Sequence, residues 1–422
     1  SVFQRLLVNV AHVYQGFWGR LTRVVMARPV ISVVATTALL VALSIPYWDI
    51  KAGFAGSEAL PASSDAHRGF EILNEDFSAG RLSPVQFAIV GDPESADAGV
   101  ERLRSSLADV TIPNGGSQEP AFLPVPEGEW VTWNEDGTVG LAEVTFSIAS
   151  NDTRAFDLVD DLREDVVPAA FNGTGAEVYV TGETAFNQDF FTLVADYTPI
   201  VVGFVLIMSF LLLLLAFRSV VVSAKAILMN LLSVGAAYGL LVLVFQKGVG
   251  ADLFGFQETP TIEAWLPLFL FCVLFGLSMD YHVFLLSRIR EHYDLTGRNR
   301  DSVAVGLHST AKIITGAALI MVAVFGGFAS GQLVMLQQMG FGLGVAVLLD
   351  ATVVRSILVP AAMALLGDLN WYLPSWLQWL PDLRVEGGSE APVAVAPEPV
   401  PAPAVARPRL HLPHLHLPKL GH

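Results

Sequence analysis

The chain has 422 residues, of which 53% are apolar and only 15% are charged, and its formal net charge is -16. Its mean hydropathy of +0.54 lies outside the range of ordinary soluble globular proteins. The charge is unevenly distributed, because residues 48–196 hold 27 Asp and Glu against 7 Lys and Arg. The composition therefore predicts a membrane protein with one acidic soluble domain, and it excludes nucleic-acid binding because that domain would repel phosphate.

Six apolar runs are each long enough to cross the ~30 Å hydrocarbon core of a bilayer as a helix. The runs are residues 30–48, 197–217, 220–245, 264–286, 312–329 and 340–366. We therefore predict a polytopic α-helical membrane protein with six transmembrane helices in a one-plus-five arrangement, with the acidic domain between the first and the second helix.

Lys and Arg in the short loops predict the orientation, because these residues are retained on the cytoplasmic side. Basic residues precede the first run and lie between the second and third and between the fourth and fifth, all on one side. The loops on the opposite side, 247–263 and 331–339, nearly lack them. We expect a multi-pass protein of the cytoplasmic (inner) membrane, with both termini cytoplasmic and the acidic domain extracytoplasmic.

The composition divides the chain into six parts. They are a cytoplasmic linker or surface helix (1–28), the first transmembrane helix (29–48), the extracytoplasmic domain (49–196), a five-helix transmembrane bundle (197–366), an amphipathic interfacial segment (367–384) and a disordered cytoplasmic tail rich in Pro and Ala (385–422). The tail histidines lack the spacing of a closed metal site, so no metal is predicted. The chain begins with Ser1 and not with Met, so the sequence leaves open whether it is a fragment of a longer protein.

The acidic domain shows alternating strand and helix signals. Strands are predicted at 84–90 and 177–181, helices at 94–109 and 152–171, and two strands within 130–147 around the turn sequence 134–137. The order β-α-β-β-α-β is that of a ferredoxin-like α+β domain. Residues 182–196 look helical and are expected to continue directly into the second transmembrane helix.

Asp280 stands about two turns inside one end of the fourth apolar run. A charged Asp near the bilayer centre costs about 2.5–3.5 kcal/mol on insertion scales, so we expect it to face the bundle interior and to be paired or protonated. A carboxylate that alternates between buried and cation-paired surroundings can take up and release a proton. We predict that Asp280 carries a coupling proton; a structural ion pair is the alternative.

The sixth run contains a second charged pair, Asp350 and Arg355. Residues three or four apart contact each other best along an α-helix, and these two are five apart. We therefore expect Arg355 to reach another helix or the membrane interface, and Asp350 to look toward the bundle. Both are assigned to a proton relay, with a packing ion pair or a topology anchor as the alternative.

Tyr281 and His282 follow Asp280 directly. Tyr281 can relay a proton or hydrogen-bond the carboxylate, and it is assigned to the relay, although an aromatic residue in a membrane helix often serves packing. His282 lies about 100° around the helix from Tyr281, and packing is the preferred interpretation for it. Glycines 326, 327, 331, 340, 342 and 344 are expected to allow close helix contacts.

The string Gly276–Arg288, the one-plus-five plan and the βαββαβ domain together resemble the C-terminal half of an MMPL family transporter of the resistance-nodulation-division superfamily. Residues 275–374 are similar to the actinobacterial YdfJ-like branch. The resemblance implies proton-driven export of lipids or hydrophobic compounds, with Asp280 and Tyr281 as proton site, the outer domain as porter domain and no cofactor. It also implies a matching N-terminal half or a second copy of this chain as partner.

Two other functions remain open from the residues alone. A protein-translocation factor or a sensor could share the six-helix plan, and the proton site would serve a translocation factor equally well. An intramembrane aspartyl protease would use Asp280 and Asp350 as its dyad. The protease is the less favoured, since no Gly-x-Gly-Asp string accompanies Asp350. The sequence therefore favours a secondary active transporter and not an enzyme.

Overall fold

The computed structural model describes residues 17–380 except 55, 57–59, 62, 77–78, 115, 127, 129 and 151. The predicted tail at 385–422 and the first 16 residues of the predicted linker lie outside the described residues. Of that linker, the helix α2 (Phe17–Ala27) is described.

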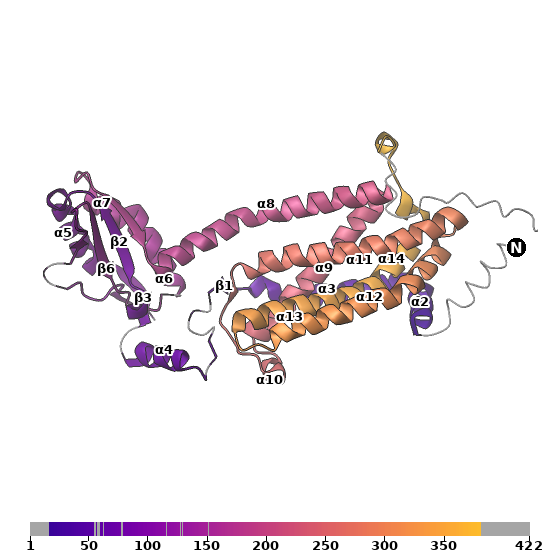
Figure 1. Ribbon diagram of the computed structural model, residues 1–422, viewed down its shortest axis with the longest axis horizontal. Helices are drawn as coiled ribbons and strands as arrows, with labels where there is room; N and C mark the ends of the chain where they lie inside the picture. The colour runs from indigo at the N-terminus through magenta and orange to yellow at the C-terminus, as the bar shows by residue number, and fades with distance from the viewer. Residues whose placement is uncertain are drawn as a thin grey trace, which may run out of the picture. The chain divides into compact units, whose positions relative to one another are not determined.

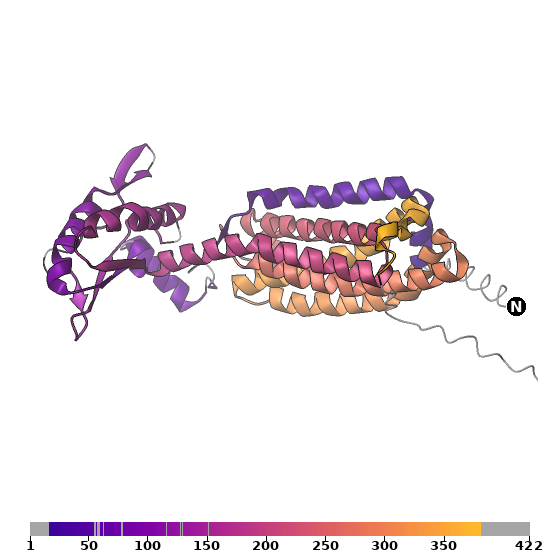
Figure 2. The same ribbon diagram turned by 90° about the horizontal axis from the view of Figure 1, so that it is seen from above.

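Six helices in the described residues are long and apolar enough to cross a membrane, which confirms the predicted number. Figures 1 and 2 show those of the bundle running alongside one another. Their elements are α3 (Pro29–Ser44) with η1 (Ile45–Asp49), α8 (Glu183–Phe217), α9 (Val220–Leu241) with the π-helix η5 (Val242–Gln246), α11 (Leu266–Thr296), α12 (Asn299–Ala329), and α13 (Val334–Leu349) continued by the π-helix η6 (Asp350–Leu358), α14 (Val359–Leu366) and η7 (Gly367–Trp371).

The helix α12 begins 13 residues before the predicted start at Lys312, at Asn299. Its first turns alternate polar residues with Val303, Leu307 and Ala311, which are buried. An amphipathic helix of this kind buries one apolar face against its neighbours, here α11, while its mean hydropathy stays low. A search for uniformly apolar runs therefore misses it.

Glycine allows close backbone contacts at only some of the predicted positions. A Cβ atom added at Gly340 would overlap backbone atoms of α12, and one at Gly342 would lie 2.8 Å from a methyl carbon of Leu270. A Cβ at Gly326 or Gly327 would meet nothing within 4 Å, so the prediction of close contacts is wrong for those two. An unpredicted close contact joins Gly239 of α9 to the Leu43 carbonyl at the end of α3.

Residues 85–181 form an α+β domain around a four-stranded sheet in the order β5-β6-β2-β7, with every neighbouring pair antiparallel. The strands are β2 (Val85–Val90), β5 (Thr132–Trp133), β6 (Val139–Val144) and β7 (Glu177–Thr181). The helices are α5 (Pro93–Asp109), α6 (Thr153–Asp161), the π-helix η4 (Leu162–Val166) and α7 (Val167–Phe171).

Buried and more exposed side chains alternate along β2 and β6, and the buried ones form the core of this domain. Val85, Phe87 and Ile89 are buried, whereas the residues between them are only partly so, and they pack in one cluster with buried residues of α5 and α6. Asp92 caps α5 by accepting a hydrogen bond from the amide of Ser95, as an N-cap carboxylate does.

Several short elements were not predicted. They are β1 (Ala52–Gly53), which pairs in parallel with β8 (Ile262–Glu263), α4 (Asp65–Asp76), η3 (Ala79–Leu82), the hairpin of β3 (Thr111–Asn114) and β4 (Ser117–Pro120), α10 (Ala251–Phe254) and η8 (Ser375–Leu377). The predicted interfacial segment at 367–384 contains, in its described part, only η7 and η8. Apart from α4, these elements have at most five residues, too few to establish a periodic pattern.

One uninterrupted helix, α8, follows the last strand of the domain and continues into the bundle. After β7, Gly182 turns the chain with φ 108°, and α8 then runs from Glu183 to Phe217 over 35 residues. A Cβ atom at Gly182 would lie 2.6 Å from the carbonyl oxygen of Pro84, so the turn has both a conformational and a steric need for glycine. The prediction that 182–196 continues as a helix into the second span is confirmed.

Candidate functional site

Asp350 and Arg355 form a buried ion pair in the π-helix η6. Their side chains are 7% and 2% exposed, and the guanidinium Nη2 lies 2.5 Å from the carboxylate Oδ2. The expectation that residues five apart would not meet is wrong. In a π-helix the backbone hydrogen bonds join residues i and i+5, so side chains five apart lie above one another.

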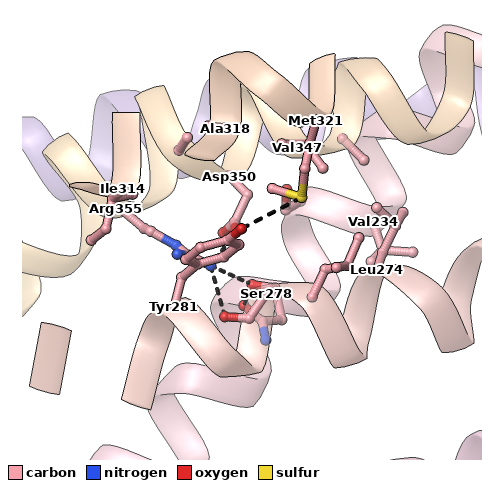
Figure 3. A pocket seen from close by; sticks show the side chains of 15 residues that line it. Val234, Leu274, Ser278, Tyr281, Ile314, Ala318, Met321, Val347, Asp350 and Arg355 are labelled. Atoms are coloured by element: carbon pink, nitrogen blue, oxygen red, sulfur yellow. Dashed lines mark hydrogen bonds and ion pairs between the residues drawn. The ribbon is translucent and has the colours of Figure 1, made fainter. Parts of the chain in front are cut away.

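Arg355 also reaches a second helix, as predicted. Its Nη2 donates to the backbone carbonyl of Ser278 on α11 at 2.7 Å and to the Ser278 hydroxyl at 3.3 Å. The Ser278 hydroxyl in turn donates to Oδ1 of Asn230 on α9 at 2.8 Å. The charged pair is therefore held at the junction of η6, α11 and α9 (Figure 3).

The Tyr281 ring lies beside the same guanidinium. The Arg355 Cζ stands 4.8 Å from the ring centroid, a cation–π contact, while the Tyr281 hydroxyl donates to the sulfur of Met321 at 3.5 Å. The predicted hydrogen bond from this hydroxyl to a carboxylate is replaced by the bond to sulfur. Sulfur is a weak acceptor, so this bond is readily exchanged for a stronger one.

The Asp280 side chain is exposed in this chain, so the expectation that it faces the bundle interior is wrong. The buried face of α11 is set by Met279 and His282, and Asp280 projects about 100° away from Met279. The described residues give its carboxylate no hydrogen-bond or ion-pair partner, although it contributes to the electrostatic surroundings of Arg355. Arg355 is thus the common neighbour of all the predicted site residues.

A small cavity of about 20 Å³ adjoins the ion pair. Figure 3 shows Tyr281, Asp350, Arg355 and Ser278 converging at it, with apolar side chains of α9, α11, α12 and α13 completing the wall. A cavity of this size holds about one water molecule. The ion pair itself is buried, which strengthens the charge interaction within it.

Ser278 and Asn230 belong to this network and were not predicted as site residues. The sequence held a clue to Ser278: a buried Arg needs several hydrogen-bond acceptors, and Ser278 is the hydroxyl closest in sequence to Tyr281 on the same helix. In the described part of the chain, no group of three or more His, Cys, Asp or Glu side chains is placed to hold a metal ion.

The sequence matches the MMPL family over residues 58–379. It is 37% identical over 371 residues to the mycolic acid-containing lipids exporter MmpL11 of Mycolicibacterium smegmatis, covering 88% of this chain and 38% of that protein. It is 37% identical over 361 residues to the heme uptake protein MmpL11 of Mycobacterium tuberculosis (86% and 36%) and 32% identical over 371 residues to the membrane protein YdfJ of Bacillus subtilis (88% and 49%). These matches confirm the predicted resemblance, and the chain spans less than half the length of each relative.

Proposed function

The chain belongs to the MMPL family, and from this premise we propose that it is part of a secondary transporter that exports lipids or hydrophobic compounds across the cytoplasmic membrane, driven by protons. The observation that carries the proposal is the buried Asp350–Arg355 pair, hydrogen-bonded to Ser278 and covered by Tyr281. Burying an ion pair inside a membrane bundle costs desolvation free energy, and ionisable residues found there usually mark ion or proton pathways, so a functional role is favoured over a packing role.

In this proposal the proton binds at Asp280 or Asp350 and alters the partners of Arg355. Protonation of either carboxylate removes a negative charge near the guanidinium, which then relies on Ser278 and the Tyr281 ring. Because Ser278 and Tyr281 lie on α11 while Asp350 lies on η6, the change shifts the balance of contacts between these two elements. That shift is the coupling step.

The exposed Asp280 supports a partner in the membrane. A charged carboxylate facing lipid costs about 2.5–3.5 kcal/mol, and a partner surface with polar groups removes that cost. A matching N-terminal half or a second copy of this chain is the partner that we propose. Asp280 is then half of a site that the partner completes.

We propose further that the domain of residues 85–181 is a ferredoxin-like porter domain that faces away from the cytoplasm. Numbering its strands by chain position gives the sheet order 2-3-1-4 with antiparallel neighbours, which supports the split βαβ arrangement. The basic loops at the other end of the bundle support the orientation.

The cargo is proposed from the relatives. One is named for the export of mycolic acid-containing lipids and another for heme uptake, and both names describe large, mainly apolar molecules. The surface of such cargo suits a pathway through or beside a membrane bundle. Export is the proposed direction, and a transport assay with fluorescent lipid and with heme tests both direction and cargo.

The decisive experiment measures proton uptake and cargo transport by the protein in liposomes under an imposed pH gradient. Asp280→Asn and Asp350→Asn should each lower both activities at least about a hundredfold, the scale of losing a proton-transfer group. Asp252→Asn is the matched control, since Asp252 lies in α10 outside the long apolar helices, and it should leave both unchanged. Full transport by Asp280→Asn would refute the proposal. Cargo movement without proton uptake would favour a different energy source or a sensor.

A further inference from the structure

His282 is the most completely buried titratable side chain that the coupling step does not use. It is 0% exposed on α11, and neither of its ring nitrogens has a hydrogen-bond partner among the described residues. Buried polar groups almost always have a partner, whether protein or ordered water. Since the described protein atoms supply none, ordered water is the remaining partner for this ring.

The neighbours of His282 are cationic. Arg355 of η6 and Lys225 of α9 both lie close enough to the ring to interact with it electrostatically. Lys225 is itself only 8% exposed. Among the described residues, its ammonium donates a hydrogen bond to Oδ1 of Asn370, at 3.0 Å. An ammonium has three donors, so two remain for water.

The register of the helices puts these groups in one line. The Ser278 side chain on α11 contacts Asn230 on α9, which fixes the level at which the two helices meet. Because α9 and α11 run in opposite directions, His282, one turn further along α11, lies at about the level of Lys225. Asn370 lies in η7 at the end of the bundle where α9 begins. The line thus extends from the Arg355 site to that end, which the proposed orientation places in the cytoplasm.

Further unpaired polar atoms mark the inner end of the same line. They are Oδ1 of Asp350, Nε of Arg355 and Nδ2 of Asn230, all buried without a partner among the described residues. All three residues line the cavity of about 20 Å³, which has room for about one water that could bond to two or three of these atoms.

We propose that His282 and Lys225, joined by buried water, form the route by which the coupling proton leaves the Asp350–Arg355 site for the cytoplasmic end of the bundle. This proposal rests on the proposed proton-driven transport and adds a release path to it. The groups that face His282 are Arg355 of η6 and Lys225 of α9, with Asp350 and Asn370 beyond them.

The proton transfer balances without any other reactant. The carboxyl of Asp350 loses its proton to a bridging water, which passes a proton to one imidazole nitrogen, and the opposite N–H releases a proton to the water beside Lys225. The ring ends neutral, and the carboxylate regains its bond to Arg355. Because two cations repel a third positive charge, the imidazolium is short-lived and the ring conducts the proton instead of storing it.

Hydroxyl-radical footprinting of the intact protein in membranes tests whether the path holds water. His282 should be oxidised at least about tenfold faster than Phe275 after correction for intrinsic reactivity, because radicals form from water next to the side chain. Phe275 is the control, since it is 1% exposed on the same helix, and His308 is an exposed histidine that reports the upper limit. Equal, background-level oxidation of His282 and Phe275 would overturn the proposal.

Proton uptake by variants in liposomes tests the role of the ring. His282→Leu should lower uptake at least about tenfold, and His282→Gln, which keeps hydrogen bonds to water but cannot pass a proton through a ring, should lower it as well. Native uptake by a correctly inserted His282→Leu protein would overturn the route. A different result would refute the proposed proton coupling: His282 is hydrated in the wild type, but Asp280→Asn leaves proton uptake unchanged. The failure of the release route and the failure of the coupling can therefore be told apart.

Discussion

Arg355 is the residue on which the site depends, because it contacts three different kinds of group at once. Its guanidinium pairs with the Asp350 carboxylate, donates to Ser278 and stacks beside the Tyr281 ring. A guanidinium can do this since its donors lie in a plane and its face remains free for an aromatic ring. The sequence assigned Arg355 to a relay with Asp350 and Tyr281 but predicted neither its direct bond to Asp350, which depends on the π-helix, nor its bond to Ser278.

Arg355→Lys tests this geometry at constant charge. A lysine ammonium is a compact point charge that cannot hold the carboxylate, the Ser278 carbonyl and the ring together, so proton uptake should fall at least about tenfold, a loss of roughly 1.4 kcal/mol. Arg288→Lys is the control, because Arg288 forms an exposed pair with Glu291. Native uptake by Arg355→Lys would mean that only its charge matters.

A residue in the soluble domain gives a pH-dependent prediction. The pKa of the Asp152 carboxyl lies below its usual value, chiefly because the Arg154 side chain donates a hydrogen bond to it, while partial burial opposes this shift. Since the folded pKa is the lower one, the stabilisation is complete above the unfolded pKa of about 4 and is lost as the pH falls through the folded pKa.

Hydrogen exchange of α6 measures this effect, because Asp152 is the N-cap of that helix. Asp152→Ala should speed exchange in α6 at neutral pH by the equivalent of about 1 kcal/mol, and the difference from wild type should disappear at acidic pH. A mutation effect that persists unchanged at low pH would contradict the assignment to the ionised carboxylate.

At the scale of elements, the sequence predicted long periodic features and missed geometry that depends on a single residue. Six apolar helices and the strand and helix sequence of the soluble domain follow from patterns that extend over many positions. The π-helix at Asp350 does not, because its extra residue per turn leaves the apolar pattern nearly unchanged. The exposed position of Asp280 was missed for a related reason: membrane helices are apolar all round, so periodicity does not reveal which side faces the bundle.

The close contact between α3 and α9 gives a prediction for helix packing. Gly239→Ala places a methyl group against the Leu43 carbonyl, and the overpacking should destabilise the protein in detergent by about 1–3 kcal/mol. Gly326→Ala is the matched control, because a Cβ there meets nothing within 4 Å and alanine favours a helix. Thermal unfolding followed by circular dichroism compares the two, and equal midpoints would contradict the tight contact.

For the whole molecule, the side of α11 that carries Asp280 is the surface that a partner would cover in the proposed transporter. Gly276 lies one turn before Asp280 and is also exposed. The chain has a single cysteine, Cys272, so a Cys272→Ala background allows one cysteine to be placed at will.

In that background, Gly276→Cys should form a disulfide or a bifunctional cross-link with the proposed partner in native membranes. Ile320→Cys, on an exposed apolar face of α12, is the control and should stay uncross-linked. The mass of the product separates a second copy of this chain from a different N-terminal half. Cross-linking of Ile320→Cys but not of Gly276→Cys would place the partner on another face.

The length of α8 has a mechanical consequence for any such transporter. At 1.5 Å per residue, its 35 residues extend over about 52 Å, so a tilt of about 10° at one end displaces the other by about 9 Å. Pro199 removes one backbone hydrogen bond within this lever and so marks the place where it bends most easily. Movements of an ångström beside a carboxylate can in this way become movements as large as a lipid headgroup.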